Sequence, residues 1–560
     1  MNKFLFFLML MASSTSVTSC TQDDPYEEYF NNWMNNNVTP NTSSGNSSTT
    51  GELASFDVAI DKTTAEPTDV ASAYYPDEED MLENNDFSTE VAIDLSNPVS
   101  MTVDGVEITV NGSHVTANHG SEKKVCYVVS GSTTNGSLTI LGDKKYAVKL
   151  NGVSITNPDS AALNLLSNKR AFVILADGTT NTLTDGVGGS QKGTLYCKGK
   201  LLFNGSGSLS VTGNTNNGIH SADYITFSKG CNIYVKATEN HGVKANDGIF
   251  INGGVLNVEV SAAAAKGINS ESHIIINGGR TTVLTTGNGA YDTTDKSVKG
   301  AACIKTDSTL TVNGGELWLK STGSGGKGIN VDMEANFNGG SVYVVTTGGQ
   351  YKINNDSSSP KGIKVDGNIN ISGGRIWVRT SGYNGEGIET KKQMTITGGY
   401  VYAQGQHNDG LDANGNCYIK GGTIFAICSG TPEVAIDANT EGGYKLYVTG
   451  GTIVAVGGVE NGSSLSQSCY QASSWSASTW YALTVGSSTF SFKTPSSGGS
   501  GLVVSGASQP TLLSGVSVSD GSSYFGGLGI YGGTVSGGTN ISLSSYSGGN
   551  GMNSGPGGWH

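Results

Sequence analysis

A spaced repeat of glycine followed by an apolar residue constrains this chain more than any other feature. The pair first appears at Gly218-Ile219 and returns in steps of 23 to 25 residues, with two longer steps of 36 and 34 residues. The first residue of the pair is Gly218, Gly242, Gly267, Gly328, Gly362, Gly387 and Gly410, and in two further coils a small residue, Cys303 or Ala435, replaces the glycine. A unit of about 25 residues with short strands between glycine turns has the size of one coil of a parallel β-helix.

A second landmark repeats in phase with the first. Glycine pairs occur at Gly253-Gly254, Gly278-Gly279, Gly314-Gly315, Gly339-Gly340, Gly373-Gly374, Gly398-Gly399, Gly421-Gly422 and Gly450-Gly451. Two landmarks in phase predict that equivalent positions of successive coils stack about 4.8 Å apart, the distance between neighbouring strands. The two longer steps predict loop insertions at 285–300 and 346–360, both at the same corner of the coil.

The composition agrees with an all-β solenoid. The chain has 82 glycines but only 11 prolines, and 14% of its residues are charged, which excludes collagen and a charged disordered chain. We expect an N-terminal segment at 52–99, a parallel β-helix at 100–456, and a small β-rich module with a flexible Gly/Ser tail at 457–560. The net charge of −14 disfavours nucleic acid as a partner and favours cations or neutral ligands.

The N-terminus has the features of a targeting segment. Lys3 precedes an apolar run at 4–12 that is too short to span a bilayer, and small residues then lead to Cys20. This pattern predicts a lipoprotein signal peptide at 1–19 with Cys20 acylated, followed by a polar tether at 20–51; the alternative is an ordinary secretory signal with a chance cysteine. The acidic residues behind Cys20 resemble the surface-export tags of lipoproteins in some Gram-negative gut bacteria. We therefore expect a monomeric outer membrane lipoprotein on the cell surface, held to the membrane by its lipid anchor only.

The other seven cysteines show neither CxxC spacing nor an even number. They are Cys126, Cys197, Cys231, Cys303, Cys417, Cys428 and Cys469. We expect them to be small buried apolar side chains rather than zinc ligands or disulfide partners.

Strand alternation predicts which side chains enter the core. Apolar residues on both sides of each glycine pair, such as Ile249 and Leu256, should point inward. Asn252, Asn277, Asn313 and Asn338, which directly precede glycine pairs, should stack as an asparagine ladder with a structural role.

One outward column of the repeat is acidic. Its carboxylates are Glu389, Asp412 and Asp437 two places after the turn residue, Glu386 and Asp409 one place before it, and Glu433 nearby. Two carboxylates at the coil spacing repel each other by roughly 3–4 kcal/mol at an effective dielectric constant of 20. The column must therefore take up protons or a hard cation with oxygen ligands, for which calcium is the best candidate, unless it is simply a solvated acidic face.

A second acidic column lies four places after the turn residue. It contains Glu271, Asp307, Asp332 and Asp366 over four coils, and Lys305 and Lys364 stand two places earlier. Two interpretations stay open, a further set of metal ligands or a solvated face balanced by lysines.

A third outward column is aromatic. Trp318, Tyr343, Trp377, Tyr402 and Phe425 stand three places after five consecutive glycine pairs. Such a strip, roughly 20 Å long, suits the apolar faces of sugar rings, and the flanking Arg375 and Arg379 could pair with sugar carboxylates. The alternative is that residues 457–560 fold back and bury the strip.

Several segments resemble a family of bacterial carbohydrate-binding domains. They are DGVEITVNGSHVTANHG (104–120), LNGVSITNPDSAALNLLSNKRAFVILADGTTNTLTDG (150–186), and coils such as KGIKVDGNINISGG and DGLDANGNCYIKGG. The resemblance, which covers about residues 100–456, implies a right-handed parallel β-helix like that of the pectate lyases, bound calcium, and recognition of polysaccharides including acidic ones. The family's acidic calcium-binding turns match Glu389, Asp409 and Asp412, whereas Lys391 stands where other coils carry Asp or Asn.

The resemblance implies binding rather than turnover. We expect a non-catalytic, calcium-dependent polysaccharide-binding protein. One alternative is a pectate-lyase-like enzyme, which would need a calcium-held uronate and a nearby arginine or lysine as base. The other alternative is a structural surface adhesin that binds no glycan.

Overall fold

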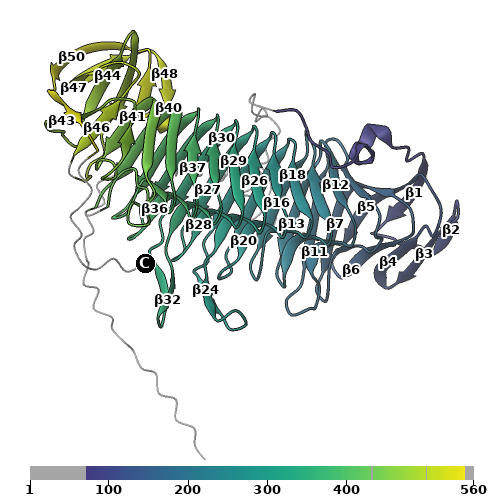
Figure 1. The fold of residues 1–560 in the computed structure, drawn as a ribbon. Helices are drawn as coiled ribbons and strands as arrows, with labels where there is room; N and C mark the ends of the chain where they lie inside the picture. Colours follow the sequence, from purple (N-terminus) through teal and green to yellow (C-terminus); the bar gives the residue numbers. More distant parts are fainter. Residues whose placement is uncertain (1–70, 431–432, 500, 549–560) are drawn as a thin grey trace, which may run out of the picture. The chain divides into compact units, whose positions relative to one another are not determined.

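The computed structural model describes residues 71–430, 433–499 and 501–548 of the chain. The predicted signal peptide, Cys20, the tether and part of the N-terminal segment lie outside the described residues, as does the end of the tail. Nearly all the regular structure is β, and the predicted all-β solenoid is confirmed, with about 14 turns (Figure 1).

Each coil contributes one strand to a 14-stranded sheet, here called sheet B, and two to a 27-stranded sheet, sheet A. Sheet B contains β2 (Met101–Val103), β3 (Val106–Asn111), β4 (Ser113–Asn118), β6 (Gly136–Leu141), β8 (Leu163–Leu165), β11 (Gly193–Cys197), β14 (Asn217–Ser221), β17 (Val243–Ala245), β20 (Lys266–Ser270), β25 (Ala302–Thr306), β28 (Lys327–Val331), β33 (Lys361–Val365), β36 (Glu386–Thr390) and β39 (Leu411–Ala413). From β4 onward its neighbours pair in parallel, one coil to the next.

Sheet A carries two strands of each coil, one on either side of a turn that contains a glycine pair from Gly253-Gly254 onward. The strands before these turns are β9 (Ala171–Leu175), β12 (Leu201–Gly205), β15 (Tyr224–Phe227), β18 (Gly248–Ile251), β21 (Ile274–Ile276), β26 (Thr309–Val312), β29 (Glu334–Phe337), β34 (Ile369–Ile371) and β37 (Met394–Ile396). The strands after them are β10 (Thr180–Asp185), β13 (Ser208–Gly213), β16 (Asn232–Ala237), β19 (Val255–Val260), β22 (Arg280–Thr285), β27 (Glu316–Ser321), β30 (Ser341–Thr346), β35 (Arg375–Thr380) and β38 (Tyr400–Gly405). In β5 (Val125–Thr133), β7 (Tyr146–Asn157), β40 (Cys417–Cys428) and β41 (Leu446–Val456) the two strands of a coil are continuous.

Glycine is favoured at the two repeated positions for two different structural reasons. The second glycine of each pair adopts a positive φ, for example +77° at Gly254, which a residue with a Cβ adopts only with strain. The turn glycines of sheet B allow close packing instead, because a Cβ on Gly267 would lie 2.1 Å from Cγ1 of Val283. Both landmarks in the sequence therefore mark positions where a larger side chain does not fit.

The core and the asparagine ladder are as predicted. The inward residues form one continuous buried cluster, and all seven cysteines of the described part are buried and unbridged. Asn277 donates to Oδ1 of Asn252 over 2.8 Å and accepts from Nδ2 of Asn313 over 2.9 Å, so each amide links two coils. At its N-terminal end the ladder binds the backbone of Tyr74, whose N–H and C=O both contact the Asn252 amide.

The two insertions form β-hairpins at the same corner. The first contains β23 (Ala290–Asp292) and β24 (Ser297–Lys299), and the second contains β31 (Tyr351–Ile353) and β32 (Asp356–Ser358). The hairpins touch, because the Val298 N–H donates to the Asp356 carboxylate over 2.6 Å. Figure 1 shows β24 and β32 projecting from the coils.

The N-terminal end of the stack is closed by strands that leave the parallel pattern. In sheet B, β2, β3 and β4 pair antiparallel, and in sheet A β1 (Thr89–Asp94) adds a parallel strand to β5. Two short 3-10 helices, η1 (Glu78–Asp80) and η2 (Leu82–Asn84), precede β1, and Arg170 pairs with Asp80 over 2.7 Å.

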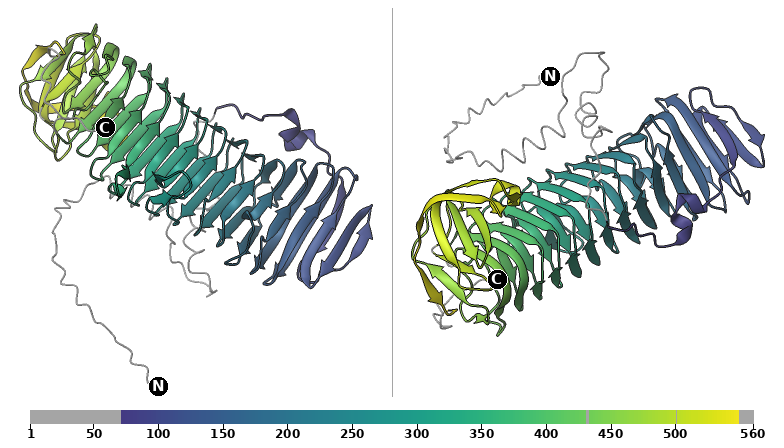
Figure 2. Two further views of the ribbon diagram at one scale, coloured as in Figure 1. Left: turned by 60° about the horizontal axis from the view of Figure 1, so that its bottom comes forward. Right: turned by 90° about the horizontal axis from the view of Figure 1, so that it is seen from above.

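The C-terminal module closes the other end. Its six-stranded antiparallel sheet contains β44 (Trp480–Val485), β45 (Ser488–Lys493), β47 (Thr511–Ser519), β48 (Ser522–Tyr524), β49 (Gly529–Tyr531) and β50 (Thr534–Asn540), with the 3-10 helix η3 (Phe525–Gly527) between β48 and β49. Sheet A continues into β42 (Ser464–Leu465), β43 (Cys469–Ala472), β46 (Leu502–Ser505) and β51 (Leu543–Tyr546). Because β46 pairs antiparallel with β41, the last coil has no open strand edge there. Figure 2 shows the module, in yellow, against the last green coils.

Candidate functional site

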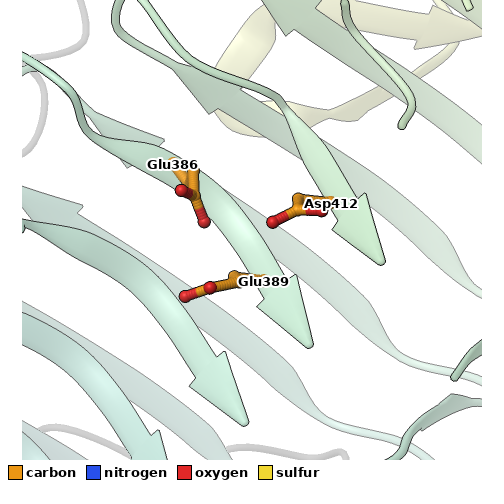
Figure 3. A group of neighbouring side chains, drawn as sticks. All are labelled: Glu386, Glu389 and Asp412. Carbon is orange, nitrogen blue, oxygen red and sulfur yellow. The ribbon is translucent and has the colours of Figure 1, made fainter. Parts of the chain in front are cut away.

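Three carboxylates of the predicted acidic column meet on the outer face of sheet B. In β36 the side chain of Ile388 points into the core, so Glu389 points outward, and the pairing of β36 with β39 sets Glu389 beside Asp412. Glu386, at the start of β36, completes the group: each of the three residues offers one oxygen, and these oxygens lie within 4.8 Å of one another. Figure 3 shows the three side chains extending from neighbouring strands into the same space.

Two lysines neutralise part of this cluster. Lys361 lies beside Glu386 in the β33–β36 pairing, and its ammonium contacts Oε1 of Glu386 and, over 3.1 Å, Oε2 of Glu389. Lys391 contacts the other oxygen of Glu389. Burial alone would raise the pKa of Glu389, but the two ammonium groups lower it to about 2, so this carboxylate stays ionised.

Glu386 retains one oxygen for another ligand. Its Oε1 also accepts a hydrogen bond from Nδ2 of Asn408 over 3.0 Å, whereas its buried Oε2 has no hydrogen-bond partner within the part of the chain that the structure describes. Burial raises the pKa of Glu386 despite the ammonium of Lys361. An unsatisfied buried oxygen of this kind favours a proton or a cation.

The carboxylates beyond Glu386 carry a larger electrostatic penalty. Burial, followed by the charges of Glu386 and Glu389, raises the pKa of Asp412 well above its usual range. Burial and the charge of Glu433 do the same for the pKa of Asp409, although its carboxylate accepts the Val434 N–H over 2.8 Å. One coil further, burial and Asp409 raise the pKa of Asp437 to about 10. Burial and the neighbouring carboxylates thus act together against ionisation along this column.

The second acidic column is paired with lysines. The contacts are Lys244 with Glu271 at 2.8 Å, Lys305 with Asp307 and Asp332 at 2.7 Å each, and Lys364 with Asp366 at 2.5 Å. The four carboxylates are 41 to 50% exposed, and none belongs to the group of three found among the described residues. These contacts favour the solvated, lysine-balanced face over further metal ligands.

A column of largely buried lysines was not anticipated from the sequence. Lys266, Lys327 and Lys361 each precede a turn glycine, the position that Glu386 and Asp409 occupy in later coils. Lys327 is buried beneath the second hairpin, where it donates to the Ser358 hydroxyl over 2.6 Å. Burial and the charge of Lys364 lower its pKa to about 7. The recurrent KGI sequence was the available signal for this column.

The aromatic strip faces away from the core, as predicted, but it is not open to solvent. Its rings stack along the coils, with centroid distances of 4.1 Å between Trp318 and Tyr343 and 5.7 Å between Trp377 and Tyr402. Trp377 is 5% and Phe425 0% exposed. The expectation that the strip offers free ring faces to sugars is therefore wrong for these buried rings, whereas Tyr343 is half-buried. The alternative of a seam buried under residues 457–560 holds for the last two rings.

The C-terminal module covers the last two rings of the strip. Phe425 packs against Phe492 of β45 at 5.4 Å, and Tyr402 packs against Phe525 of η3 at 5.9 Å. Arg375, expected to meet sugar carboxylates, lies 5.0 Å from the ring centre of Tyr524. Arg379 is half-buried on the same strand, β35.

Comparisons with known proteins agree with a carbohydrate-binding domain. A family model described as "Carbohydrate-binding domain-containing protein" matches residues 104–264 and 319–410, which include Glu386, Glu389 and Asp409. A protein of that description from Acetivibrio thermocellus is 27% identical over 166 residues, and the match spans 28% of this chain and 56% of the relative. The chain thus spans little more than half the length of the curated relative that it matches.

A solved structure, a gadolinium derivative of a polysaccharide lyase-like protein from C. thermocellum, aligns with 50% of this chain and 96% of that chain. Its TM-score is 0.33 and its sequence identity 21%. Within the described ranges, no helix is both long and apolar enough to cross a membrane.

The buried seam gives a stability test. Phe425→Ala removes a fully buried ring from between Tyr402 and Phe492, and we expect it to lower the free energy of unfolding by about 3–5 kcal/mol in urea denaturation. Tyr444→Ala, at a tyrosine that is 45% exposed, is the control and should change stability by less than about 0.5 kcal/mol. Unchanged stability of Phe425→Ala would show that the module does not cover the strip in solution.

The buried ammonium of Lys327 predicts a pH dependence of stability. Its folded-state pKa of about 7 lies below the value of roughly 10.4 for an exposed lysine. The unfolded chain therefore holds this proton more tightly, so the destabilisation is complete below about pH 7 and fades as the pH rises towards about 10. We expect Lys327→Met to raise stability by about 2–4 kcal/mol at pH 6 and by much less at pH 10, measured by urea denaturation.

Two features make this test specific. Lys327→Met removes the hydrogen bonds of the ammonium to the Ser358 hydroxyl and to the Gly325 carbonyl, but Ser358 still donates to that carbonyl over 2.9 Å. Lys352→Met, at an exposed lysine of the same hairpin, should leave the pH profile unchanged. If Lys327→Met changes the free energy of unfolding by the same amount at pH 6 and at pH 10, burial of the ammonium carries no penalty.

Proposed function

We propose that this chain is a cell-surface lipoprotein that binds polysaccharide through a calcium-containing β-helix and does not cleave it. The observation that carries the proposal is the match of a carbohydrate-binding family model to 104–264 and 319–410, which includes the coil of Glu386 and Glu389. Attachment through Cys20 and exposure at the outer membrane surface rest on the sequence of 1–51. We propose a monomer, because the strand edge of the last coil is already paired within the chain.

In the acidic cluster, Glu386, Asp412 and Asp409 fit a hard cation, whereas Glu389 does not. Both oxygens of Glu389 contact ammonium groups, so this residue has little capacity left for a metal. Glu386 through Oε2, together with Asp412 and Asp409, offers oxygens whose burial is costly without a positive partner. Calcium suits such a site, because it accepts carboxylate oxygens in irregular geometry. When bound, it would neutralise these carboxylates and supply positive charge to a saccharide oxygen.

Binding without turnover is supported by the state of the basic residues. A lyase needs an arginine or lysine that can reach the C5 proton of a uronate. Lys361 is held between Glu386 and Glu389, and Arg375 lies against Tyr524 of the C-terminal module. Lys327, whose low pKa would suit a base, is covered by Ser358. These contacts favour a binding protein over a lyase.

Polysaccharide binding is tested by a glycan array and by affinity electrophoresis in polygalacturonate, xyloglucan and mixed-linkage β-glucan, each with calcium and with a chelator. We expect retardation by at least one polysaccharide and its loss or weakening in the chelator. Absence of binding on the array and in every gel would favour a structural adhesin. Release of 4,5-unsaturated products, detected by ultraviolet absorbance, would identify a lyase instead.

The calcium proposal is tested at Asp412. Because Asp412 lies between Glu389 and Asp437, Asp412→Ala should lose a bound calcium ion, counted by elemental analysis. Stability in calcium should fall by roughly 2–4 kcal/mol when the free ion exceeds its dissociation constant by hundreds of times. In a chelator the loss should vanish or reverse, because the substitution removes carboxylate repulsion.

The matched control is Asp332→Ala, which removes an exposed carboxylate already paired with Lys305. It should leave both the calcium content and the calcium-dependent stability unchanged. If Asp412→Ala costs the same with and without calcium, the column is a solvated acidic face and contains no metal.

A further inference from the structure

An exposed pair of aromatic rings lies at the turns that lead into the acidic cluster. Tyr383 is 65% exposed, more than the other exposed tyrosines of the described ranges, Tyr74, Tyr291 and Tyr444. Its ring lies 5.3 Å from that of His407 in the next coil, and the two planes are inclined by 47°. The His407 side chain is exposed as well. The pair therefore presents two ring faces to solvent, unlike the buried strip on sheet A.

The backbone beneath these rings is held in an uncommon arrangement. Gly385 and Gln406 form an antiparallel bridge, with N–H to carbonyl hydrogen bonds of 3.2 and 2.8 Å, inside an otherwise parallel stack of coils. Asn384 and His407 have φ values of +58° and +54°, in the left-handed region that residues with a Cβ seldom adopt. The turns are thus fixed to each other, and the strain is of the kind that structures retain at ligand sites.

The equivalent turns of two earlier coils carry small residues instead of an aromatic ring. The left-handed residue at this corner is Ala264 in one of them and Gly325 in the other, and the residues before these are Ala263 and Ser324. In the coil of the acidic cluster this position is Tyr383. The large side chain is therefore a departure from the repeat, and the coil geometry alone does not require it.

The aromatic pair is joined directly to the acidic cluster. Asn408 follows His407 and donates to Oε1 of Glu386 over 3.0 Å, and Tyr383 stands three residues before Glu386 in the same turn. The His407 N–H is held by the Ser429 hydroxyl at 3.1 Å. The exposed rings and the buried carboxylate of Glu386 are thus connected through the backbone of two neighbouring turns.

The hairpins lie next to this turn. A Cβ placed on Gly382 would meet the Gly348 carbonyl at 1.9 Å and Cγ of Pro360 at 3.1 Å, so the turn of Tyr383 packs against both ends of the second insertion. That insertion in turn contacts the first hairpin through Asp356 and Val298. The turn that carries Tyr383 therefore lies against the base of the second hairpin.

We propose that Tyr383 and His407 form a sugar-stacking subsite that binds the apolar face of a pyranose residue of the polysaccharide. Axial C–H groups of a sugar pack on an aromatic face while its hydroxyls stay hydrated or hydrogen-bonded. Because the planes are inclined by 47°, one sugar ring cannot lie flat on both, so Tyr383 supplies the stacking face and His407 flanks it. This subsite deepens the proposed function and rests on it.

The subsite is tested by affinity electrophoresis in polygalacturonate, xyloglucan and mixed-linkage β-glucan, with calcium present. For the polysaccharide that retards the wild type, we expect Tyr383→Ala to weaken binding about five- to tenfold. Tyr383→Phe keeps the ring and should stay within about twofold of the wild type. His407→Asn, which tolerates a positive φ but removes the ring, should weaken binding about threefold.

Tyr444→Ala, at an exposed tyrosine of another turn, is the control and should bind like the wild type. Melting temperatures of Tyr383→Ala and Tyr383→Phe should match that of the wild type, because the side chain is mostly exposed. If the wild type is retarded and Tyr383→Ala equally so, the subsite is overturned while polysaccharide binding stands. If Tyr383→Phe loses as much as Tyr383→Ala, the hydroxyl rather than the stacked ring is responsible, and the stacking proposal fails. If no polysaccharide retards the wild type, the proposed function fails and the subsite with it.

Discussion

The in-register stacking of parallel coils is the constraint on which every other feature of this protein depends. Each outward side chain has an equivalent neighbour about 4.8 Å away on both sides, so a favourable or unfavourable contact is multiplied along the stack. Asparagine suits such a column, because one amide such as that of Asn277 donates to one coil and accepts from the next. An ionised carboxylate only accepts, so stacked carboxylates need a lysine, a proton or a cation.

The stacked carboxylates of sheet B are neutralised in different ways along the sheet. Where Lys305 and Lys364 stand among the carboxylates of the second column, ion pairs remove the repulsion at half-exposed positions. Between β33 and β36 the charge of the side chain before the turn glycine changes from positive at Lys361 to negative at Glu386, and these two residues form an ion pair. In the following coils, lysines do not offset the effects of burial and of the neighbouring carboxylates. The pKa values of Asp412 and Asp437 are therefore raised. The calcium ion that we propose would therefore bind where the charge of the repeat changes sign.

Because residues at equivalent positions of the repeat become neighbours in the stacked coils, the periodic features of the fold and of the site could be predicted from the sequence. Glycine spacing predicted the coils, and alternation predicted the core, the asparagine ladder and the three clustered carboxylates, whose proximity follows from strand register. Alternation placed Phe425 outside the core but could not identify Phe525 above it, because that ring lies 100 residues later and belongs to no repeat. The reach of Lys361 to two carboxylates was missed because it depends on side-chain paths across the coil. Tyr383 was missed because it is a single departure from the repeat and forms no column.

Several departures from the repeat occur together in two successive coils. The change of charge at Glu386, the antiparallel bridge of Gly385 with Gln406 and the left-handed non-glycine residue His407 all occur between 382 and 410. A solenoid whose stability comes from repetition gains none from such exceptions, because each introduces strain or uncompensated charge. Meanwhile the last two rings of the aromatic strip, Tyr402 and Phe425, pack against the C-terminal module. Regular columns thus build and close the stack, and the irregular corner of sheet B is where the proposed ligand sites lie.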